Sequence, residues 1–425
     1  MKKHLIIGCG PAALSALDKI RKITAEDEIK LVTRESFLPY SPSILPYLIG
    51  GRIPEETIWL KEKDYFKSMK ASLESDKEVV SIDPWVKQVT YQSGEEEAYD
   101  TLLIATGAKP VLPVIQGLEE GNCFVFHNLS DYHKLKKELA GKKEVVIYGA
   151  GLVAVELAMC LLENGYAVKI IARSRLLRRY FNQQVGNFIE DTFRQKGAEI
   201  YLQSEVVAVE REKEKMNISL NNSRDLNADL FVLAIGVKPE TSFLAGTGLP
   251  VKDGIRAGYY LETELPEIYV AGDVAAAPGF FDDQPGINPI LPNALAQGKV
   301  AGANMAGKQT RYEGWIPVNL FYLFGRQAFS IGLTATADGS EYQVYEEQNR
   351  ARGQFKKLVF QEDYLVGAQF FNVGVDPGVF RYLITERVKI SPYNELLGVQ
   401  PVETSRWLML GNEQKSIFTG EEGSK

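Results

Sequence analysis

The sequence contains little cysteine and little histidine. Of its 425 residues, three are cysteine (Cys9, Cys123 and Cys160) and three are histidine, and no two cysteines form a Cys-x-x-Cys pair. The chain therefore cannot supply four thiolates to an iron–sulfur cluster, and no zinc spacing is visible, so we expect no metal site. This cysteine usage is typical of a reducing compartment, and we expect a cytoplasmic protein.

Long hydrophobic runs and an excess of positive charge are also missing. The start, MKKHLIIGCGPAALSAL, imitates a signal peptide, but the Gly-x-Gly inside it has a better explanation given below, and no stretch reaches the ~18 apolar residues of a membrane span. The net charge is −7 (48 basic and 55 acidic residues), which argues against a nucleic-acid partner. With 45% hydrophobic residues, a chain of this length predicts two or three globular domains.

The segment HLIIGCGPAALSALDKIRK is typical of a strand, a tight turn and a helix. Its Gly8-x-Gly10-x-x-Ala13 pattern is that of a dinucleotide-binding loop, in which the glycines permit the turn and the approach of a pyrophosphate, and the small third residue lets the helix lie close to the strand. A second strand ends near Glu35, whose carboxylate we expect to bind the ribose hydroxyls. Arg34 beside it either contacts the adenosine or phosphates or is a solvated loop charge.

The same pattern occurs a second time. Gly149-x-Gly151-x-x-Ala154 is followed by a helix expected to reach Leu162 and a strand expected over residues 167–171. One such motif also fits a glycine-containing turn in another α/β protein. Two of them predict two dinucleotide sites, the arrangement needed for hydride transfer between a flavin and a nicotinamide.

Four further stretches carry a family resemblance. In order they are YDTLLIATGAKP (99–110), ADLFVLAIGVKPE (228–240), IYVAGDVA (268–275) and NALAQGKVAGANMAG (293–307). With the glycine loops, the chain resembles the FAD/NAD(P)-dependent pyridine nucleotide-disulfide oxidoreductase superfamily. The resemblance implies an α/β fold with two Rossmann-like dinucleotide-binding domains, as in glutathione reductase, plus a C-terminal α+β interface domain.

The resemblance also implies domain limits. The FAD-binding domain is expected at 1–112 and 244–312, the NAD(P)-binding domain at 113–243 and the interface domain at 313–425. Within the last, KKLVFQEDYLVGAQFF predicts two antiparallel strands joined at Glu362-Asp363. YNELLGVQPVETSRWLML is expected to be helical, and residues 411–425 are expected to be loose.

Site residues follow from the motifs and the resemblance together. Asp273 is expected on the flavin ribityl chain and Glu156 near the nicotinamide, although Asp273 would also suit a helix cap and Thr106 an ordinary strand end. Agreement across levels favours the flavin interpretation. The expected FAD contacts are Gly8, Gly10, Pro11, Ala12, Ala13, Arg34, Glu35, Ser43, Val79, Ala105, Thr106, Gly107, Gly272, Asp273, Asn293 and Ala294. The expected NAD(P) contacts are Gly149, Gly151, Leu152, Val153, Glu156, Ala172, Arg173, Arg175, Ile235 and Gly236.

No side chain is identified with certainty as catalytic. Disulfide reductases of the superfamily use a cysteine pair and a C-terminal histidine, but this chain has no such pair and no histidine after residue 133. A related group uses one redox cysteine at the position of Ser43, and a serine hydroxyl cannot cycle through sulfenate or a mixed disulfide. Pro42, Ser43 and Glu156 are therefore candidates only for lying beside the flavin, with Ser43 either a hydrogen-bond donor or a helix cap.

The turn PYSPSILPY is similar to that of the flavin subunits of multisubunit oxidoreductases, including those of phenylglyoxylate dehydrogenase and of tungsten-dependent aldehyde oxidoreductase complexes. This implies an FAD-dependent NAD(P)H:acceptor oxidoreductase that exchanges electrons with an iron–sulfur subunit or a ferredoxin-type protein, and an NAD-reducing role in such a complex. Two alternatives stay open: a stand-alone NAD(P)H oxidase or diaphorase, and a non-catalytic flavin- and nucleotide-binding regulatory subunit. The interface domain would make either a homodimer or a hetero-oligomer.

The choice between NAD and NADP rests on the end of the second fold's second strand. NAD-specific enzymes usually carry an acidic residue there for the ribose 2′-hydroxyl, whereas this chain has Ala172. Arg173 and Arg175, which follow, would suit a 2′-phosphate, but they also fit positions facing solvent or the pyrophosphate. The family resemblance favours NAD, so we expect NAD, with NADP as the alternative.

Overall fold

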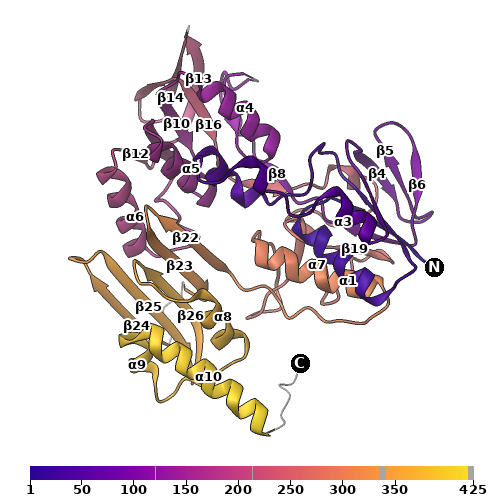
Figure 1. Cartoon of the computed structure of the whole chain (residues 1–425). Coiled ribbons are helices and arrows are strands. Elements are labelled where there is room, and N and C mark those ends of the chain that lie inside the picture. The colour runs from indigo at the N-terminus through magenta and orange to yellow at the C-terminus, as the bar shows by residue number, and fades with distance from the viewer. Residues whose placement is uncertain (120, 213, 335–340, 420–425) are drawn as a thin grey trace. The chain divides into compact units, whose positions relative to one another are not determined.

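The structure, a computed structural model, describes residues 1–119, 121–212, 214–334 and 341–419 (Figure 1). The chain divides into two compact units. Each unit consists of three segments of the chain. Unit 1 contains Met1–Val114, Phe124–Gly141 and Ile235–Ile316. Unit 2 contains Ile115–Cys123, Lys142–Ala234 and Pro317–Lys425. The three domains expected from the sequence are a different and finer division, whose limits stay a prediction. The largest difference is Phe124–Gly141, which we expected with the second glycine loop and which lies in unit 1.

Unit 1 is built on a five-stranded parallel sheet with the strand order β19-β7-β1-β2-β3. Its central strands β1 and β7 are short and largely buried, because both faces of a parallel sheet are covered, whereas β2 and β3 also carry charged residues. The chain leaves β1 toward β2 on one side and returns through β7 on the other, so the carboxyl ends of β1 and β7 form a switch point where ligands of such sheets bind. The strands are β1 (Lys3–Ile7), β2 (Glu28–Val32), β3 (Ala71–Glu74), β7 (Thr101–Ile104) and β19 (Ile268–Val270).

Helices α1 (Pro11–Ile23) and α7 (Leu291–Met305) pack against each other beside this sheet (Figure 1). The contact is very close because α7 presents glycines to the backbone of α1. A Cβ on Gly298 would lie 2.1 Å from the carbonyl oxygen of Ala12, and one on Gly302 would lie 2.5 Å from that of Ala16. A larger residue at either glycine would therefore push α7 away from α1.

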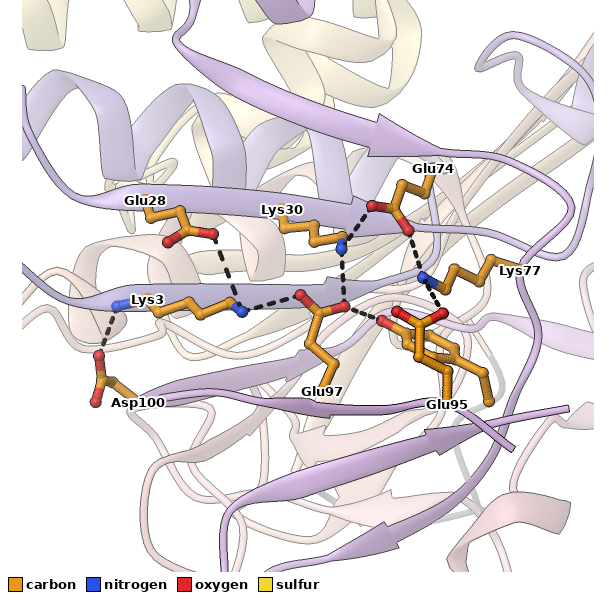
Figure 2. Close-up of polar contacts among 9 residues, drawn as sticks. Lys3, Glu28, Lys30, Glu74, Lys77, Glu95, Glu97 and Asp100 are labelled. Carbon is orange, nitrogen blue, oxygen red and sulfur yellow. Dashed lines mark hydrogen bonds and ion pairs between the residues drawn. The ribbon is translucent and has the colours of Figure 1, made fainter. Parts of the chain in front are cut away.

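A second, antiparallel sheet of unit 1 consists of β4 (Val79–Asp83), β5 (Gln88–Tyr91) and β6 (Glu96–Ala98). A charged network joins it to the parallel sheet (Figure 2). The carboxylate of Glu97, 8% exposed, lies 3.0 Å from Nζ of Lys3 and 2.9 Å from Nζ of Lys30, and it also accepts a hydrogen bond from the Tyr91 phenol. Lys30 in turn lies 2.6 Å from Glu74. Every buried charge that these contacts involve thus has an opposite charge beside it.

The other elements of unit 1 are short. Helix α4 begins with a capping box, in which Asn128 and Asp131 each bond the other's backbone N–H, and β8 pairs with β17 in antiparallel fashion. The elements are η1 (Pro42–Ile44), α2 (Leu45–Ile49), η2 (Glu55–Thr57), α3 (Lys63–Ser68), β8 (Ala108–Pro110), β9 (Phe124–Val125), α4 (Leu129–Leu139), β17 (Val237–Pro239), η3 (Ser242–Leu244), β18 (Ile255–Arg256), β20 (Ala275–Pro278) and β21 (Pro285–Gly286).

Unit 2 begins with the second Rossmann-like fold. Its parallel strands have the order β12-β11-β10-β16, and the helix and strand predicted after the second glycine loop are confirmed as α5 and β11. A small antiparallel sheet, β13-β14-β15, is added to it. The elements are β10 (Glu144–Tyr148), α5 (Leu152–Glu163), β11 (Ala167–Ala172), α6 (Gln183–Gln195), β12 (Glu199–Leu202), β13 (Val206–Glu212), β14 (Lys215–Leu220), β15 (Asp225–Ala228) and β16 (Leu230–Leu233).

The rest of unit 2 is an antiparallel sheet of order β22-β23-β26-β25-β24 with the helices α8, α9 and α10. The predicted hairpin is confirmed: β25 and β26 pair around Glu362, whose φ is +52°. Phe329 and Phe370 stack in the core with Phe380 against their edges. The elements are β22 (Val318–Leu323), β23 (Arg326–Gly332), β24 (Tyr342–Asn349), β25 (Gln354–Gln361), β26 (Tyr364–Phe371), α8 (Pro377–Thr385), α9 (Asn394–Val399) and α10 (Pro401–Thr419).

The expectation of a loose segment 411–425 is wrong for residues 411–419, which continue α10. One reason lies in the contact of this helix with α8, where the Asn412 amide donates a hydrogen bond to the Tyr382 hydroxyl at 3.1 Å. Residues 420–425 lie outside the described residues. Within the described part of the chain, no helix combines the length and apolar character that crossing a bilayer requires.

Candidate functional site

The first glycine loop connects β1 to α1, and Gly8 closes it. Its φ is +112°, and a Cβ there would lie 2.2 Å from the carbonyl oxygen of Ala105, just after β7. The Gly8 N–H donates to the carbonyl of Val32 at the end of β2 at 2.8 Å. Gly8 thus lies against the carboxyl ends of two neighbouring strands, where only glycine fits.

The N-terminus of α1 is open to an anion. Gly10 is the N-cap residue, and among the described residues no side chain caps the helix. A Cβ on Gly10 would have no described atom within 4 Å. Pro11 takes the first helical position, where a missing N–H costs nothing, and Ala12 and Ala13 are buried. The unsatisfied N–H groups and the helix dipole therefore fit the pyrophosphate of a dinucleotide.

Glu35 lies in the loop after β2 and is held on two sides. The Tyr40 phenol donates to a carboxylate oxygen of Glu35 at 2.8 Å and accepts the backbone N–H of Leu129, at the start of α4, at 2.8 Å. Burial and the nearby Glu35 charge raise the pKa of Tyr40, so the phenol stays protonated and remains a donor. The N–H of Asp76, after β3, donates to the Glu35 carbonyl at 3.4 Å. This support keeps the carboxylate near the sheet edge where a ribose is expected.

Arg34 is a partner of Glu240. Its guanidinium lies 3.2 Å from the Glu240 carboxylate, which is 8% exposed and also accepts hydrogen bonds from Lys109 and Ser242 at 2.8 Å each. Burial alone would raise the pKa of Glu240, but the bonds from Lys109 and Ser242 lower it to about 2. Arg34 therefore has a structural role, and its contact with FAD stays a prediction.

Thr106 and Gly107 connect to the same Glu240 through its backbone. The Thr106 hydroxyl donates to the Glu240 carbonyl at 3.0 Å, and the Glu240 N–H donates to the Gly107 carbonyl at 3.1 Å. Gly107 has a φ of +66°, and the Ala105 N–H donates to Ile7 at the end of β1 at 2.8 Å. These bonds fix the strand end beside the first glycine loop, and Thr106 does more than end a strand.

Asp273 follows Gly272, whose φ is +84° and whose added Cβ would lie 3.2 Å from the Cβ of Ala12. The loop that carries Asp273 is therefore close to the start of α1. Burial raises the pKa of the Asp273 carboxyl. The next element is the strand β20, so the alternative that Asp273 caps a helix is wrong.

Gln297 on α7 was not expected in the site. It is fully buried, and its side-chain oxygen accepts the Gly272 N–H at 2.8 Å. Its amide nitrogen is also buried and has no hydrogen-bond partner among the described residues. A buried amide donor without a partner is rare in proteins, and a cofactor group beside Gly272 and Asp273 would supply the acceptor it needs.

Asn293 and Ala294 belong to the first turn of α7. The Asn293 amide nitrogen donates to the Asn288 carbonyl at 2.8 Å, and its oxygen accepts the Tyr312 hydroxyl. The Asn293 side chain thus anchors α7, so a contact of this turn with FAD would involve the backbone. Val79 is 7% exposed, at the start of β4. For all three residues the contact stays a prediction.

The turn before α2 carries Pro42 and Ser43, and both are exposed. The Ser43 hydroxyl lies 2.9 Å from that of Ser41. Neither η1 nor α2 has a side-chain cap among the described residues, so Ser43 is not a helix cap. Its hydroxyl is accessible to a ligand, which fits the other role predicted for it.

The cysteine nearest to Ser43 along the chain is Cys9, which lies inside the first glycine loop. It is 8% exposed, and burial raises the pKa of its thiol to about 12. Cys160, on α5, is fully buried. Thiolate is the reactive form of cysteine, so neither position is suited to redox chemistry.

The second glycine loop repeats the geometry of the first within unit 2. A Cβ on Gly149 would lie 2.2 Å from the carbonyl oxygen of Ala234, after β16, and the Gly149 N–H donates to Ile171 in β11 at 3.0 Å. Gly151 is the N-cap of α5, which has no side-chain cap among the described residues, and a Cβ on Gly151 would meet no described atom within 4 Å. This loop also fits a pyrophosphate.

The other expected NAD(P) contacts divide between the two units. Leu152, Val153 and Glu156 lie on the first turns of α5, and Val153 is 43% exposed. Ile235 and Gly236 begin the third segment of unit 1, directly after the Ala234 carbonyl. Their contacts with the nucleotide stay predictions.

Ala172 is the last residue of β11 and is 1% exposed, and Arg173 after it is exposed. Arg175 instead folds the following loop, because one guanidinium nitrogen donates to the carbonyls of Phe181 at 2.6 Å and of Arg178 at 3.3 Å. Arg175 is thus engaged with its own loop, and its predicted contact with the nucleotide is untested.

A protein-family model described as pyridine nucleotide-disulphide oxidoreductase matches residues 2–308. The epsilon subunit of NADH-dependent phenylglyoxylate dehydrogenase from Aromatoleum evansii is 34% identical over 411 residues, which cover 96% of this chain and 97% of that protein. The chain belongs to the pyridine nucleotide-disulphide oxidoreductase family. It is therefore an FAD-dependent NAD(P)H oxidoreductase, as expected.

Solved structures agree in fold. In the covalent complex of putidaredoxin reductase with putidaredoxin, the similar chain has a TM-score of 0.86 and 24% identity, covering 96% of this chain and 98% of that one. An engineered water-forming NADPH oxidase, bound to NADPH, has a TM-score of 0.83 and 23% identity, covering 90% of each chain. These likenesses confirm the expected two-Rossmann α/β architecture.

The engineered oxidase differs from its parent by five substitutions. A glycine became alanine, and 18, 19, 20 and 25 residues later an aspartate became alanine, an alanine arginine, a methionine serine and a proline arginine. This family member has the same introduced residue at each of the five positions, at the same spacing. They are Ala154, Ala172, Arg173, Ser174 and Arg179.

Sequence reasoning missed three supporting residues of this pyridine nucleotide-disulphide oxidoreductase. Gln297 and Glu240 lie inside the quoted motifs, and Tyr40 lies in the turn that contains Ser43. Each is a polar residue that is at least nine-tenths buried. A polar residue within an otherwise apolar or small-residue stretch was the available signal, but its partner lies far away in the sequence.

Proposed function

We propose that this chain is the flavin subunit through which NAD(P)H exchanges electrons with an iron–sulfur subunit or a ferredoxin-type protein. In a multisubunit oxidoreductase it would connect the nicotinamide pool to the cluster-bearing partner and reduce NAD(P). The observation that carries this proposal is the turn before α2, which offers the hydroxyls of Ser41 and Ser43 but no thiol. Electrons then have no cysteine to pass through near this turn.

The chain's own residues fit the task of holding and orienting the cofactors. Bound FAD would supply the chemistry itself, since a flavin can exchange a hydride with nicotinamide and single electrons with an iron–sulfur partner, in either direction. The open N-terminus of α1 would bind its pyrophosphate and Glu35 its ribose. Asp273 and Gln297 would bind the part of the cofactor beside α7. The second glycine loop would bind the nicotinamide dinucleotide.

The names of the relatives agree with a partner-dependent role. The similar Aromatoleum evansii protein is named as one subunit of an NADH-dependent dehydrogenase, and the reductase with the same fold was solved in covalent complex with putidaredoxin. The engineered oxidase favours a second candidate, a stand-alone oxidase, because its fold is as similar. These two functions make different predictions for the reaction with oxygen.

Anaerobic stopped-flow spectroscopy tests the choice. The flavin of the purified protein is reduced with NADH or NADPH and then mixed with oxygen, or with an oxidised ferredoxin. We expect the ferredoxin to reoxidise the flavin at least about 10-fold faster than air does, a difference of about 1.4 kcal/mol in the barrier. Faster reoxidation by air would favour the oxidase. Reduction by neither nucleotide would favour the regulatory subunit.

We also propose that residues 313–425 contain the interface for a second copy or for the partner subunit. In support, helices α9 and α10 and the residue directly before α9 expose large apolar side chains, as interfaces do. These side chains are Tyr393, Leu396, Val399, Trp407 and Leu410. Sedimentation of the protein alone, and with a candidate partner, tests this.

A cytoplasmic location is likewise a proposal, tested by fractionation of the source cells.

Two proposals are possible for the nicotinamide cofactor that the chain uses, NADH and NADPH. NADH is favoured by the name of the Aromatoleum evansii relative. NADPH is favoured by the residues shared with the engineered oxidase, which was solved with NADPH bound. The structure of the loop after β11 bears on the choice.

A further inference from the structure

The loop of residues 173–181 after β11 is strongly basic. It contains four arginines, at positions 173, 175, 178 and 179, and no acidic residue. A carboxylate about 20 residues after the glycine loop would hold the ribose 2′-hydroxyl of NAD and repel a 2′-phosphate. The residue there is Ala172, which is buried and carries no charge.

Arg175 acts within the loop and determines its shape. Besides its bonds to the carbonyls of Phe181 and Arg178, its guanidinium packs against α6, where a Cβ on Gly186 would lie 3.1 Å from Nη1. Glu190, also on α6, stabilises the Arg175 charge and accepts the Leu176 N–H at 3.3 Å. The other three arginines are exposed and are available to a ligand.

The folded loop is attached to the second glycine loop. The Leu177 N–H donates to the carbonyl of Ala150, between the two loop glycines, at 2.8 Å. Because β10 and β11 are parallel and paired up to Tyr148 and Ile171, the residues after Ala172 start at the same sheet edge as the glycine loop. In dinucleotide-binding folds the adenosine ribose lies next to the pyrophosphate at this edge.

We propose that Arg173, Ser174 and Arg179 form a binding site for the 2′-phosphate of NADP(H), and that the chain uses NADPH in preference to NADH. The inference rests on the proposed function only in taking the second glycine loop as the nicotinamide site. Guanidinium groups bind phosphate with paired, charge-assisted hydrogen bonds, which a ribose hydroxyl cannot match. The residues shared with the engineered oxidase at five positions, Ala154 and Ala172 among them, point to the same ligand.

One carboxylate opposes this arrangement. The Ser204 N–H donates to the Ala172 carbonyl at 3.1 Å, and Glu205 follows. Burial raises the pKa of the Tyr148 phenol, and of the two nearby charges Arg173 lowers this pKa while Glu205 raises it. Against the three exposed arginines of the loop, the single exposed Glu205 leaves the local charge positive.

Isothermal titration of the full-length, FAD-loaded protein tests the proposal without any electron acceptor. The probes are NADPH against NADH, and 2′,5′-ADP against 5′-AMP. We expect the ligand with the 2′-phosphate to bind at least about 10-fold more tightly in each pair, since hydrogen bonds to a charged group commonly contribute this much or more. Equal affinities, or tighter binding of NADH, would overturn the proposal.

Three single variants identify the residues responsible. Arg173→Ala and Arg179→Ala should each weaken NADPH and 2′,5′-ADP by roughly 10- to 100-fold and change NADH little. The matched control is Arg178→Ala, which removes a neighbouring exposed arginine outside the shared pattern and should leave both nucleotides unchanged. An equal loss in Arg178→Ala would mean that general positive charge, and no defined phosphate site, binds the nucleotide.

Ala172→Asp tests the same site by adding the missing carboxylate. It should shift preference toward NADH, because the carboxylate accepts the 2′-hydroxyl and repels the phosphate. Because Ala172 is buried, the circular dichroism spectrum of the variant is compared with that of the wild type to check that it folds. If the variant does not fold, the arginine variants alone decide. A failed electron-transfer test with intact selectivity for 2′,5′-ADP would refute the proposed function and leave this site standing.

Discussion

Ser43 occupies an exposed turn, and its hydroxyl contacts only that of Ser41 among the bonds described for it. If electrons pass through the flavin alone, Ser43→Ala should change the rate of NAD(P)H-dependent reduction of an electron carrier by no more than about 2-fold, as expected for an exposed site without special contacts. Steady-state reduction of ferredoxin measures it, with Ser41→Ala as the matched control. A loss of two orders of magnitude in Ser43→Ala alone would assign the hydroxyl a part in the chemistry.

Gln297 makes a second residue-scale prediction, because it supports Gly272 and leaves an amide nitrogen without a partner among the described residues. Gln297→Leu removes the acceptor of the Gly272 N–H in both apoprotein and holoprotein. This should lower the free energy of unfolding of each form by about 1–3 kcal/mol. If the amide nitrogen donates to FAD, the holoprotein should lose more. We expect FAD to bind about 10-fold more weakly, measured by flavin fluorescence during titration of the apoprotein.

The melting temperatures of the two forms separate the roles of Gln297. A donor to FAD predicts that Gln297→Leu reduces the stabilisation on FAD binding. Equal losses in apoprotein and holoprotein would instead mean that the residue only supports the Gly272 turn.

At the scale of elements, Glu97 on β6 holds together the network of Figure 2. Burial alone would raise the pKa of Glu97, but hydrogen bonds from Tyr91, Lys30 and Lys3 outweigh it, and the pKa is lowered. A lowered pKa in the folded state means that the carboxylate stabilises the fold above its ordinary pKa of about 4.3. This stabilisation is lost as the pH falls below that value and through the folded pKa.

Glu97→Gln should lower the melting temperature at pH 7 by roughly 5–10 °C, because it leaves two lysines without their buried partner. The variant should also lose less stability than the wild type between pH 5 and pH 3, about the ordinary pKa of a glutamate. Calorimetry of both proteins across this range measures it. Glu28→Gln is the control, since Glu28 is half-exposed and 4.0 Å from Lys3, where an ion pair contributes little. A pH profile unchanged by Glu97→Gln would contradict this account.

The same elements mark what the sequence can predict. The two glycine loops, their helices and the parallel strands are local patterns, so β1, α1, β10, α5 and β11 are recognisable from the order of residues alone. The network around Glu97 is not, because it joins Lys3 to a residue more than 90 positions later. Nor is the role of Arg175, because a basic residue after a strand fits a ligand and a loop carbonyl equally well until the loop is folded.

At the scale of the whole molecule, the proposed sites would make the two half-reactions depend on different parts of the chain. The first glycine loop, Glu35, Asp273 and Gln297 belong to unit 1, and the basic loop after β11 belongs to unit 2. A change in the basic loop should therefore affect the binding of the nucleotide and leave the reaction of reduced flavin with its acceptor unchanged.

The double variant Arg173→Ala/Arg179→Ala tests this separation and a competing interpretation of the same arginines. If they bind the 2′-phosphate, flavin reduction at limiting NADPH should slow by at least about 10-fold. Reoxidation of the photoreduced flavin by ferredoxin should stay within about 2-fold of the wild type. Exposed arginines would also attract an acidic electron carrier, and rim charges of that kind mainly set association rates. Slower reoxidation with unchanged reduction by NADPH would therefore assign the basic loop to the carrier and not to the nucleotide.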